Sequence, residues 1–440
     1  MSVSRRGFVA GGAVSIALAG SLDSVFMTAA GAAEGEAYGY GPLVPDPAGV
    51  LDLPKGFSYR TFSTEGDPLP GGGVVPGSHD GMAAFPGSRH DDLRLVRNHE
   101  QEDDGTKAVA RPGLTYDPEA FGGTTTIHLG RDAGVLDQYV SLAGTADNCA
   151  GGVTPWGTWL TCEETDGFDG ETRSHGWVFE VDPAGRRTVA EPIKPLGRFE
   201  HEAVCIDPRD DTMYLTEDAD EPFGLFYRFL PRARKGGYHS YQAGGTLQAM
   251  RVPGVPDLAL VREAGTVLKG VRWVDVPDPL AVRTPVREQL DGVTRSSKLE
   301  GAWWDRRRGG RAYFVASYAL AEEGAAGDHA GQVWAYDPRR ETLELELVFE
   351  SGGRFDSPDN ITVSPYGGGV ILAEDGDGEQ FLVGTTGKGE PFALARNALN
   401  DVEFTGVTFS PDGRTLFANR QEGPGTTFAI RGPWQRLRNR

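Results

Sequence analysis

The sequence predicts an all-β chain folded as a six-bladed β-propeller with a capping insertion. Its 62 glycines and 29 prolines make the chain rich in turns, and long helical periodicity is hard to find. A strand–turn–strand unit recurs along the chain, and carboxylates recur at matching positions of its copies. Repeated hairpins of this kind stack radially in a propeller, which leaves only short sheet edges exposed.

The repeating unit begins with a polar residue, continues into an apolar strand, turns, and ends on a second strand that usually closes on carboxylates. The segment HEAVCIDPRDDTMYLTED (201–218) is a clear copy, with an Asp-Pro turn between its two apolar runs. Apolar runs on either side of such a turn predict a β-hairpin. The six copies are 79–100, 149–164, 201–218, 300–317, 359–375 and 403–420. Any β protein contains hairpins, but that alone leaves the matching carboxylates unexplained.

A second hairpin recurs between these units and predicts the outer strands of the blades. Segments 176–187 and 331–342 are near copies, and 224–235 and 425–434 are looser ones. They alternate aromatic or branched residues with polar ones, as strands do. Segment 231–298 is long and poorly patterned, so we expect an insertion that caps one face. Segment 46–69 is expected to hold a strand that closes the ring.

The first 33 residues have the layout of a twin-arginine export signal. Arg5 and Arg6 precede the apolar run 9–19, and small residues at 29–33 suit a signal peptidase. The run is too short for a membrane span, and no cysteine follows it to carry a lipid. We therefore expect 34–440 to form one propeller domain, exported by the twin-arginine machinery. It would work in the periplasm, cell envelope or medium, as a monomer without a stable membrane anchor.

The charge of the chain excludes nucleic acid as a partner and suits bound cations. With 63 acidic and 43 basic residues, the net charge is −20, whereas a nucleic-acid surface needs basic residues. The cysteines Cys149, Cys162 and Cys205 cannot all pair with one another, and they form no zinc-type CxxC pattern.

The two ends of each hairpin copy should meet near the central channel and gather acidic residues there. So many carboxylates in one cavity would repel one another, and bound multivalent cations relieve that repulsion. Oxygen donors suit Ca²⁺, whereas a thiolate among them indicates a softer or redox-active ion such as iron. The expected ring contains Asp80, Glu100, Cys149, Glu163, Glu164, Glu202, Glu217, Asp218, Glu300, Asp359, Asn360, Glu374, Asp375 and Glu403.

Several of these positions also have a purely structural interpretation. Cys149 could be a small buried residue, although the neighbouring Gly151–Gly152 pair permits close backbone approach. Cys162 and Cys205 lie inside apolar strands and are expected in the core. His99 and His201 each stand beside a glutamate, where either could bind a metal or orient a ligand.

Several segments of the chain match the motifs of one known family: RNHE (97–100), NCAGG with TPWGT (148–158), CEE (162–164), GRFEHE (197–202), PDN (358–360) and the segment 403–413. In these segments the chain resembles the PhoX-type alkaline phosphatases. The similarity spans nearly the whole mature chain in the family's order. The resemblance implies an exported propeller that hydrolyses phosphate monoesters with two ferric ions (Fe³⁺), several Ca²⁺ ions and a bridging oxo group.

The resemblance also implies which residues hold the metals. Cys149 would be an iron ligand, and iron or calcium would be held by Glu163, Glu164, Glu202, Asp218, Glu300, Asp359 and Glu403. Glu100 and Asn360 join this set from the ring. A basic side chain should also face the substrate phosphate, and Arg198 and Lys298 are the candidates, ahead of Arg97.

Two other functions fit the same ring of carboxylates. One is a calcium-dependent propeller hydrolase of another class, such as a lactonase, which needs no thiolate. The other is a non-catalytic propeller in which Ca²⁺ only joins the blades. Cys149 separates the phosphatase from both alternatives, because neither of them uses a sulfur ligand.

Overall fold

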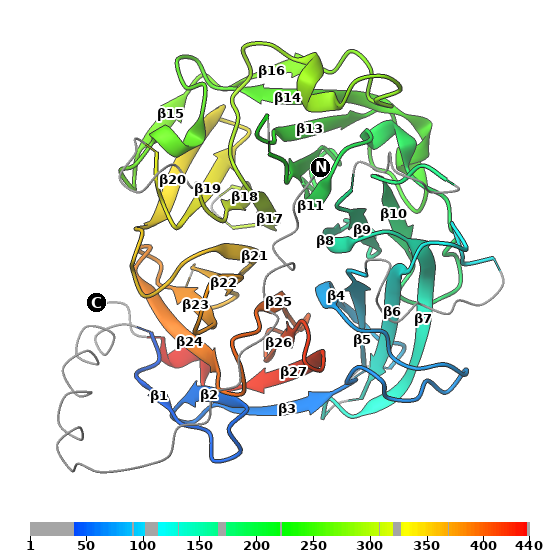
Figure 1. Ribbon diagram of the computed structural model, residues 1–440, viewed down its shortest axis with the longest axis vertical. Coiled ribbons are helices and arrows are strands. Elements are labelled where there is room, and N and C mark those ends of the chain that lie inside the picture. Colours follow the sequence, from blue (N-terminus) through cyan, green and yellow to red (C-terminus); the bar gives the residue numbers. More distant parts are fainter. Residues whose placement is uncertain are drawn as a thin grey trace, which may run out of the picture.

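The computed structural model describes residues 39–437, apart from 90–91, 102–112, 131, 166–172, 221, 308, 320–326 and 368. The export signal expected over 1–33 lies outside the described residues. Six antiparallel sheets surround a central channel, as a six-bladed β-propeller (Figure 1). The prediction of this fold class is confirmed.

The first three blades follow one another along the chain. Blade 1 contains β4 (His79–Pro86), β5 (Leu93–His99), β6 (Gly122–Leu129) and β7 (Val135–Thr145). Blade 2 contains β8 (Asn148–Val153), β9 (Trp159–Glu163) and β10 (Val178–Val181). Blade 3 contains β11 (His201–Ile206), β12 (Met213–Glu217), β13 (Phe226–Pro231), β14 (Gly245–Arg251) and β16 (Arg272–Asp275).

The last three blades gain strands from elsewhere in the chain: two in blade 5 and one each in blades 4 and 6. Blade 4 contains β17 (Leu299–Asp305), β18 (Arg311–Ala316), β19 (Gly331–Asp337), β20 (Thr342–Phe349) and β15 (Val267–Lys269). Blade 5 contains β21 (Pro358–Val363), β22 (Val370–Glu374), β23 (Phe381–Thr385), β24 (Pro391–Asn397), β2 (Leu51–Pro54) and β1 (Leu43–Val44). Blade 6 contains β25 (Phe404–Phe409), β26 (Thr415–Arg420), β27 (Thr426–Arg431) and β3 (Ser58–Phe62).

The helices of the described residues are short 3₁₀ turns. They are η2 (Lys194–Leu196), η3 (Ser240–Ala243), η4 (Leu258–Leu260), η5 (Val286–Gln289) and η6 (Trp434–Arg436). A single turn of this kind joins strands without building a layer of its own. All the described blades therefore pack directly against one another.

The N-terminal strands close the ring. β3 pairs with β27 from Phe62 opposite Thr427 to Ser58 opposite Arg431, so it becomes the outer strand of the last blade. β2 pairs with β24 in the blade before. The closing strand expected within 46–69 is thus present, and it ties the start of the described chain to its end.

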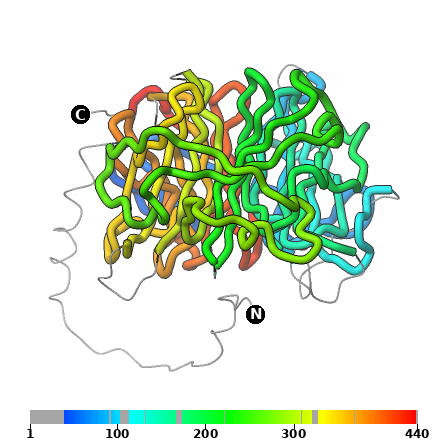
Figure 2. The backbone as a smooth tube through the Cα atoms, turned by 90° about the horizontal axis from the view of Figure 1, so that it is seen from above, coloured from blue at the N-terminus to red at the C-terminus, as the bar shows by residue number. Residues whose placement is uncertain are grey.

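Segment 231–298 lies mainly along the outside of the ring. Its strands β14 and β16 extend blade 3, and β15 pairs with the outer strand β20 of blade 4. Figure 2 shows this stretch, in green, crossing the side of the propeller. Near the end of the segment, Arg287 Nη1 lies 3.4 Å from Glu217 Oε1 and 3.7 Å from Glu200 Oε2, and so forms ion pairs with both.

Apolar faces between the blades form the core. In β20 every second residue is buried, as expected for a strand with one face in the core. Aromatic pairs join blades 3 and 4, since Phe226 stacks on Phe314 at 4.2 Å and Tyr214 on Trp304 at 6.1 Å. Cys162 and Cys205 are buried in these interblade clusters, which confirms the prediction that they belong to the core.

The innermost strand of every blade contains a β-bulge near its start. The register shifts between His79 and Met82 in β4, and between residues 148 and 151, 201 and 204, 299 and 302, 358 and 361, and 405 and 408 in the others. A bulge leaves residues outside the ladder and redirects their side chains. Glycines allow the neighbouring bulges to approach: a Cβ on Gly81 would lie 2.5 Å from the Cα of Ala150.

Candidate metal centre

The bulges place one potential ligand from each of five blades at an equivalent position of the innermost strand. Each is the second residue of its innermost strand: Asp80, Cys149, Glu202, Glu300 and Asp359. Blade 6 departs from this pattern, because its carboxylate, Glu403, directly precedes β25. The repeat of the sequence thus becomes a repeat of donor atoms around one axis.

A second set of carboxylates follows the second strand of four blades. These residues are Glu100, Glu164, Asp218 and Asp375, directly after β5, β9, β12 and β22. The backbone N–H of Glu164 donates to the carbonyl of Asp147 at 2.9 Å, and Asp375 donates to Ser357 at 2.9 Å. These bonds hold each carboxylate beside the start of its own innermost strand.

The chain enters four of the innermost strands through a left-handed residue. Ser78, Asp147, Lys298 and Ser357 have φ of 43°, 42°, 46° and 39°, and each directly precedes such a strand. A non-glycine residue in this region costs about 1–3 kcal/mol. Because the same left-handed residue recurs beside the same kind of donor, we infer that this turn helps to direct these side chains toward the channel.

The donor atoms meet in four overlapping groups, each within 4.8 Å. The groups are Cys149–Glu164–Glu202, Glu164–Asp218–Glu300, Glu202–Glu300–Asp359 and Asp359–Asp375–Glu403. We call these eight residues the ligand ring. Its Cys149–Glu202 side is buried, whereas Asp375 at the other end is exposed to solvent.

The ligand ring carries more negative charge than its environment favours. Burial, followed by the charges of neighbouring carboxylates, raises the pKa of Glu202, Asp359 and Glu403 well above the usual range. The same causes raise the pKa of Glu300 to about 7. Burial and Glu202 raise the pKa of the Cys149 thiol, which contacts the Glu202 carboxylate directly.

These residues fit a cluster of cations. Asp80 Oδ1, Glu202 Oε1 and Asp218 Oδ1 are buried and accept no hydrogen bond from the described part of the chain. Buried oxygens without donors, surrounded by like charges, are stable only when protonated or bound to cations. Seven carboxylates with one thiol match hard cations plus one ion that accepts sulfur.

Glu163 was expected to be a metal ligand, and its carboxylate faces partners outside the donor groups. Its Oε1 accepts hydrogen bonds from Ala146 N and His175 Nδ1, and its Oε2 accepts one from Trp177 N. Successive residues of a strand point to opposite faces, so Glu163 points away when Glu164 points inward. It therefore lies outside the ligand ring.

Blades 3 and 5 contain the same pair of carboxylates, one hydrogen-bonded within the protein and the next in the ligand ring. Glu217 accepts from Leu225 N and from the hydroxyl of Tyr227, while the next residue, Asp218, joins the ligand ring. Glu374 accepts from the N–H groups of Asp356 and Phe381 before the ring member Asp375. The first carboxylate of each pair accepts hydrogen bonds from nearby backbone and side-chain groups, and the second belongs to the ligand ring.

The two basic candidates differ in position. Lys298 contacts Asp218 and lies 3.1 Å from Glu300 Oε1, so it stands within the ligand ring. Arg198 donates from Nε to the carbonyl of His175 at 3.0 Å, with its guanidinium 5.9 Å from the ring centroid of Trp177. The contacts of Arg198 therefore place it beside the wall of blade 2.

Glu100 and Asn360 lie next to the ligand ring. Glu100 accepts a 2.7 Å bond from Gln421 Nε2, which is 3.3 Å from Asp80 Oδ2. Asn360 donates to Asp359 Oδ1 at 2.6 Å and accepts from Gly406 N, so it braces a ring member against blade 6. Gln421 was not expected at the site. It directly follows β26, the second strand of its blade, as Glu100 directly follows β5, and this equivalent position is the signal that could have indicated it.

A family model described as alkaline phosphatase PhoX matches residues 38–138 and 132–425. The match covers nearly all of the described chain, including every member of the ligand ring. The chain belongs to the PhoX family of alkaline phosphatases. Family membership makes it a phosphoric monoester hydrolase, and the acidic groups in its channel agree with the metal dependence of this family.

One solved structure supports the same fold, and two others are similar at lower TM-scores. A structure of Pseudomonas fluorescens PhoX in complex with vanadate, a transition state analogue, has 19% identity and a TM-score of 0.67, covering 90% of this chain and 98% of that one. A Xanthomonas campestris gluconolactonase, XC5397, has 13% identity and a TM-score of 0.45, with coverages of 90% and 98%. The pyranose dehydrogenase PQQ domain of Coprinopsis cinerea has 11% identity and a TM-score of 0.42, with coverages of 88% and 98%.

A search of curated proteins finds no match. Among the residues that the structure describes, no helix has the length and apolar character needed to cross a membrane.

Proposed function

We propose that this PhoX-family phosphatase hydrolyses phosphate monoesters at an iron–calcium cluster held by the ligand ring. The observation that carries the proposal is the group formed by Cys149, Glu164 and Glu202, which brings one sulfur into an otherwise all-oxygen set. Fe³⁺ is the ion expected beside the thiolate, and Ca²⁺ suits the all-carboxylate groups.

When bound, these ions would supply positive charge to the phosphoryl oxygens and to the attacking oxygen. The protein's own part is to hold the donors fixed and to bind the ester. Lys298 adds a fixed positive charge inside the ligand ring and is the group proposed to face the substrate phosphate. The exposed position of Asp375 favours this end of the ring as the side from which the ester enters.

Arg198 retains a proposed role in substrate binding, at the rim rather than within the ring. Its Nε is held by the His175 carbonyl beside blade 2, and it directly precedes Phe199, Glu200 and the strand of Glu202. Small phosphate esters are the proposed substrates, and the organic group would extend outward past this rim.

We also propose that the protein is exported by the twin-arginine machinery and acts as a monomer outside the cytoplasm. The arginine pair and apolar run near the N-terminus support this, since that route carries folded proteins. Replacing Arg5 and Arg6 by lysines should leave the full-length protein inside the cell. Unchanged export of this variant would contradict the proposed route.

Elemental analysis combined with turnover tests the metal assignment. Protein purified without added metals should contain both iron and calcium and should hydrolyse an aryl phosphate. Stoichiometric zinc without iron would refute the proposed cluster. Calcium alone in an active enzyme would show that the thiol is not an iron ligand.

A further inference from the structure

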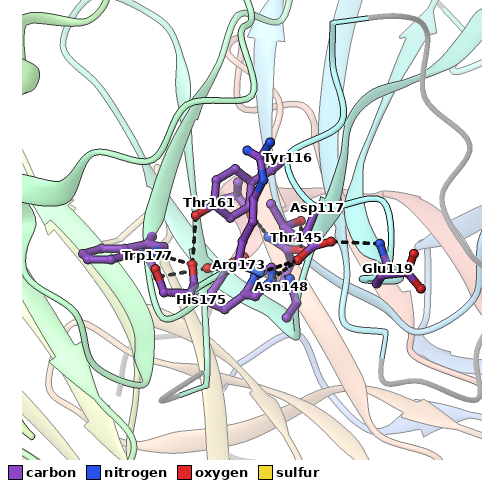
Figure 3. A network of polar contacts seen from close by, with 12 residues as sticks. Tyr116, Asp117, Glu119, Thr145, Asn148, Thr161, Arg173, His175 and Trp177 are labelled. Carbon is purple, nitrogen blue, oxygen red and sulfur yellow. Dashed lines mark hydrogen bonds and ion pairs between the residues drawn. The ribbon is translucent and has the colours of Figure 1, made fainter. Parts of the chain in front are cut away.

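A buried histidine outside the ligand ring connects two neighbouring blades. His175 lies just before β10, and its side chain is 0% exposed, like those of its two acidic neighbours. Its Nδ1 donates to Glu163 Oε1 at 2.7 Å, and its Nε2 lies 3.6 Å from Asp117 Oδ2 (Figure 3). Asp117 comes from the connection between β5 and β6, so the imidazole bridges blades 1 and 2.

The imidazole is held in a single orientation. The ring of Tyr116 meets it edge to face, with centroids 5.4 Å apart and planes at 83°. Asp117 is itself fixed, because its Oδ1 accepts from Glu119 N and its Oδ2 from Arg173 N, at 2.9 and 3.0 Å. The donor on Nδ1 therefore stays aimed at Glu163.

Glu163 connects His175 to the ligand ring through the β8–β9 ladder. It pairs with Asn148 in the β8–β9 ladder, so the two ring members of blade 2 are its direct neighbours: Glu164 follows it, and Cys149 follows its partner. Glu163 Oε1 also accepts from Ala146 N at 3.0 Å, which fixes the turn that leads into β8. Moving the carboxylate would therefore move both donors together.

The backbone of His175 reaches the third blade. Its carbonyl accepts the bond from Arg198 Nε at 3.0 Å, shortly before the strand that carries Glu202. Cys149 and Glu164 thus directly follow Asn148 and Glu163, which face each other in the ladder, and Glu202 follows shortly after Arg198, which contacts His175.

We propose that His175 is a positioning residue for the sulfur-containing group, acting through Glu163 on Cys149 and Glu164. The inference rests on the proposed metal centre, but it is read out by metal content as well as by activity. It needs no proton transfer. The contact that matters is the Nδ1 donor to Glu163, and the contact with Asp117 serves to orient the ring.

Two amide variants separate these contacts. In His175→Asn the amide nitrogen takes the place of Nδ1 and can still donate to Glu163, whereas in His175→Gln it takes the place of Nε2 and faces Asp117. His329→Asn is the matched control, because His329 is also buried and its Nδ1 accepts a hydrogen bond from the backbone N–H of Gly331, away from the ligand ring. Iron and calcium per chain, kcat, KM and the melting temperature are measured for all three.

The asparagine variant should keep metal content and kcat/KM within about threefold of wild type. The glutamine variant should lose at least half of its iron and about tenfold in kcat, with KM little changed, while His329→Asn loses only stability. Equal losses in both His175 variants, or wild-type iron in the glutamine variant, would overturn the inference. If the wild type itself hydrolyses no phosphomonoester, the proposed function fails, and iron content alone decides the role of His175.

Discussion

Glu163 and Glu164 are neighbours in sequence but face opposite sides of blade 2. Glu163 accepts hydrogen bonds from Ala146 N, His175 and Trp177 N, whereas Glu164 joins Cys149 and Glu202 at the channel. The same pairing of a hydrogen-bonded carboxylate with a member of the ligand ring recurs at Glu217–Asp218 and Glu374–Asp375. The division follows from the two-residue period of a strand.

This difference predicts opposite effects for two matched substitutions. Glu164→Gln removes a charge from two metal groups and should lower kcat about 100-fold or more, with metal content reduced. Glu163→Gln should act first on the melting temperature, because a buried acceptor of backbone N–H groups is lost, at about 1–3 kcal/mol. Circular dichroism melts and turnover of an aryl phosphate distinguish the two. Equal loss of turnover at equal stability would place Glu163 among the ligands after all.

Lys298 should act on substrate binding. Replacement by methionine keeps the aliphatic stem but removes the charge beside Asp218 and Glu300, so KM for an aryl phosphate should rise about tenfold or more. Lys298→Arg, which keeps the charge, should recover part of the affinity. A methionine variant with the wild-type KM would show that Lys298 only neutralises its acidic neighbours.

Removing the cations should destabilise the propeller. Without them the buried carboxylates of the ligand ring repel one another across the channel, and ligands that bind only the folded state contribute stability by mass action. Exhaustive chelation should therefore lower the melting temperature by roughly 5–10 °C. Re-addition of calcium should restore most of this. A melting temperature that is unchanged after verified metal loss would mean that the carboxylates are not held apart by cations.

The chelated protein should also lose stability as the pH rises. The pKa of Glu300 is raised in the folded state to about 7 by burial and by Asp218, so the folded protein retains this proton after the unfolded chain has lost it. The contribution is favourable below the unfolded value near 4.5 and disappears as the pH rises toward 7. Urea titrations of chelated protein at pH 5 and pH 7.5 check this. Greater stability at the higher pH would contradict the electrostatic account.

The sequence predicted the propeller and most of the ligand ring because both follow from one repeat. The hairpin copies give the blades, and the matching phase of their first and last residues gives Cys149, Glu202 and Asp359. The sequence could not show which glutamate of the CEE segment (162–164) faces the channel, because this depends on which residue is last in the β9 ladder. Asp375 was expected in the acidic ring but not among the residues that hold the metals.

The contribution of His175 could not be predicted from the sequence. Its partners Asp117 and Glu163 lie 58 and 12 residues away and meet it only after blades 1 and 2 pack together. The position of Arg198 depends on the same packing. Residues that act through a neighbour leave no spacing pattern, whereas residues that repeat from blade to blade do.

The other cysteines provide controls for the role of Cys149. Cys162 and Cys205 are buried in apolar clusters, so replacing either with serine places a hydroxyl among apolar groups and should cost about 1–3 kcal/mol. Metal content and turnover per folded molecule should stay at the wild-type level. Loss of iron in either variant without loss of stability would show that sulfur outside the channel contributes to the centre.

Cys149→Ser tests the central claim most directly, with turnover of an aryl phosphate, iron content and far-ultraviolet circular dichroism followed on one preparation. A serine hydroxyl stays protonated at neutral pH and is a poor substitute for a thiolate ligand. The variant should therefore lose its iron and its phosphatase activity while the propeller stays folded. Near-normal turnover with iron retained would contradict the assignment of Cys149 as the sulfur ligand of the metal centre.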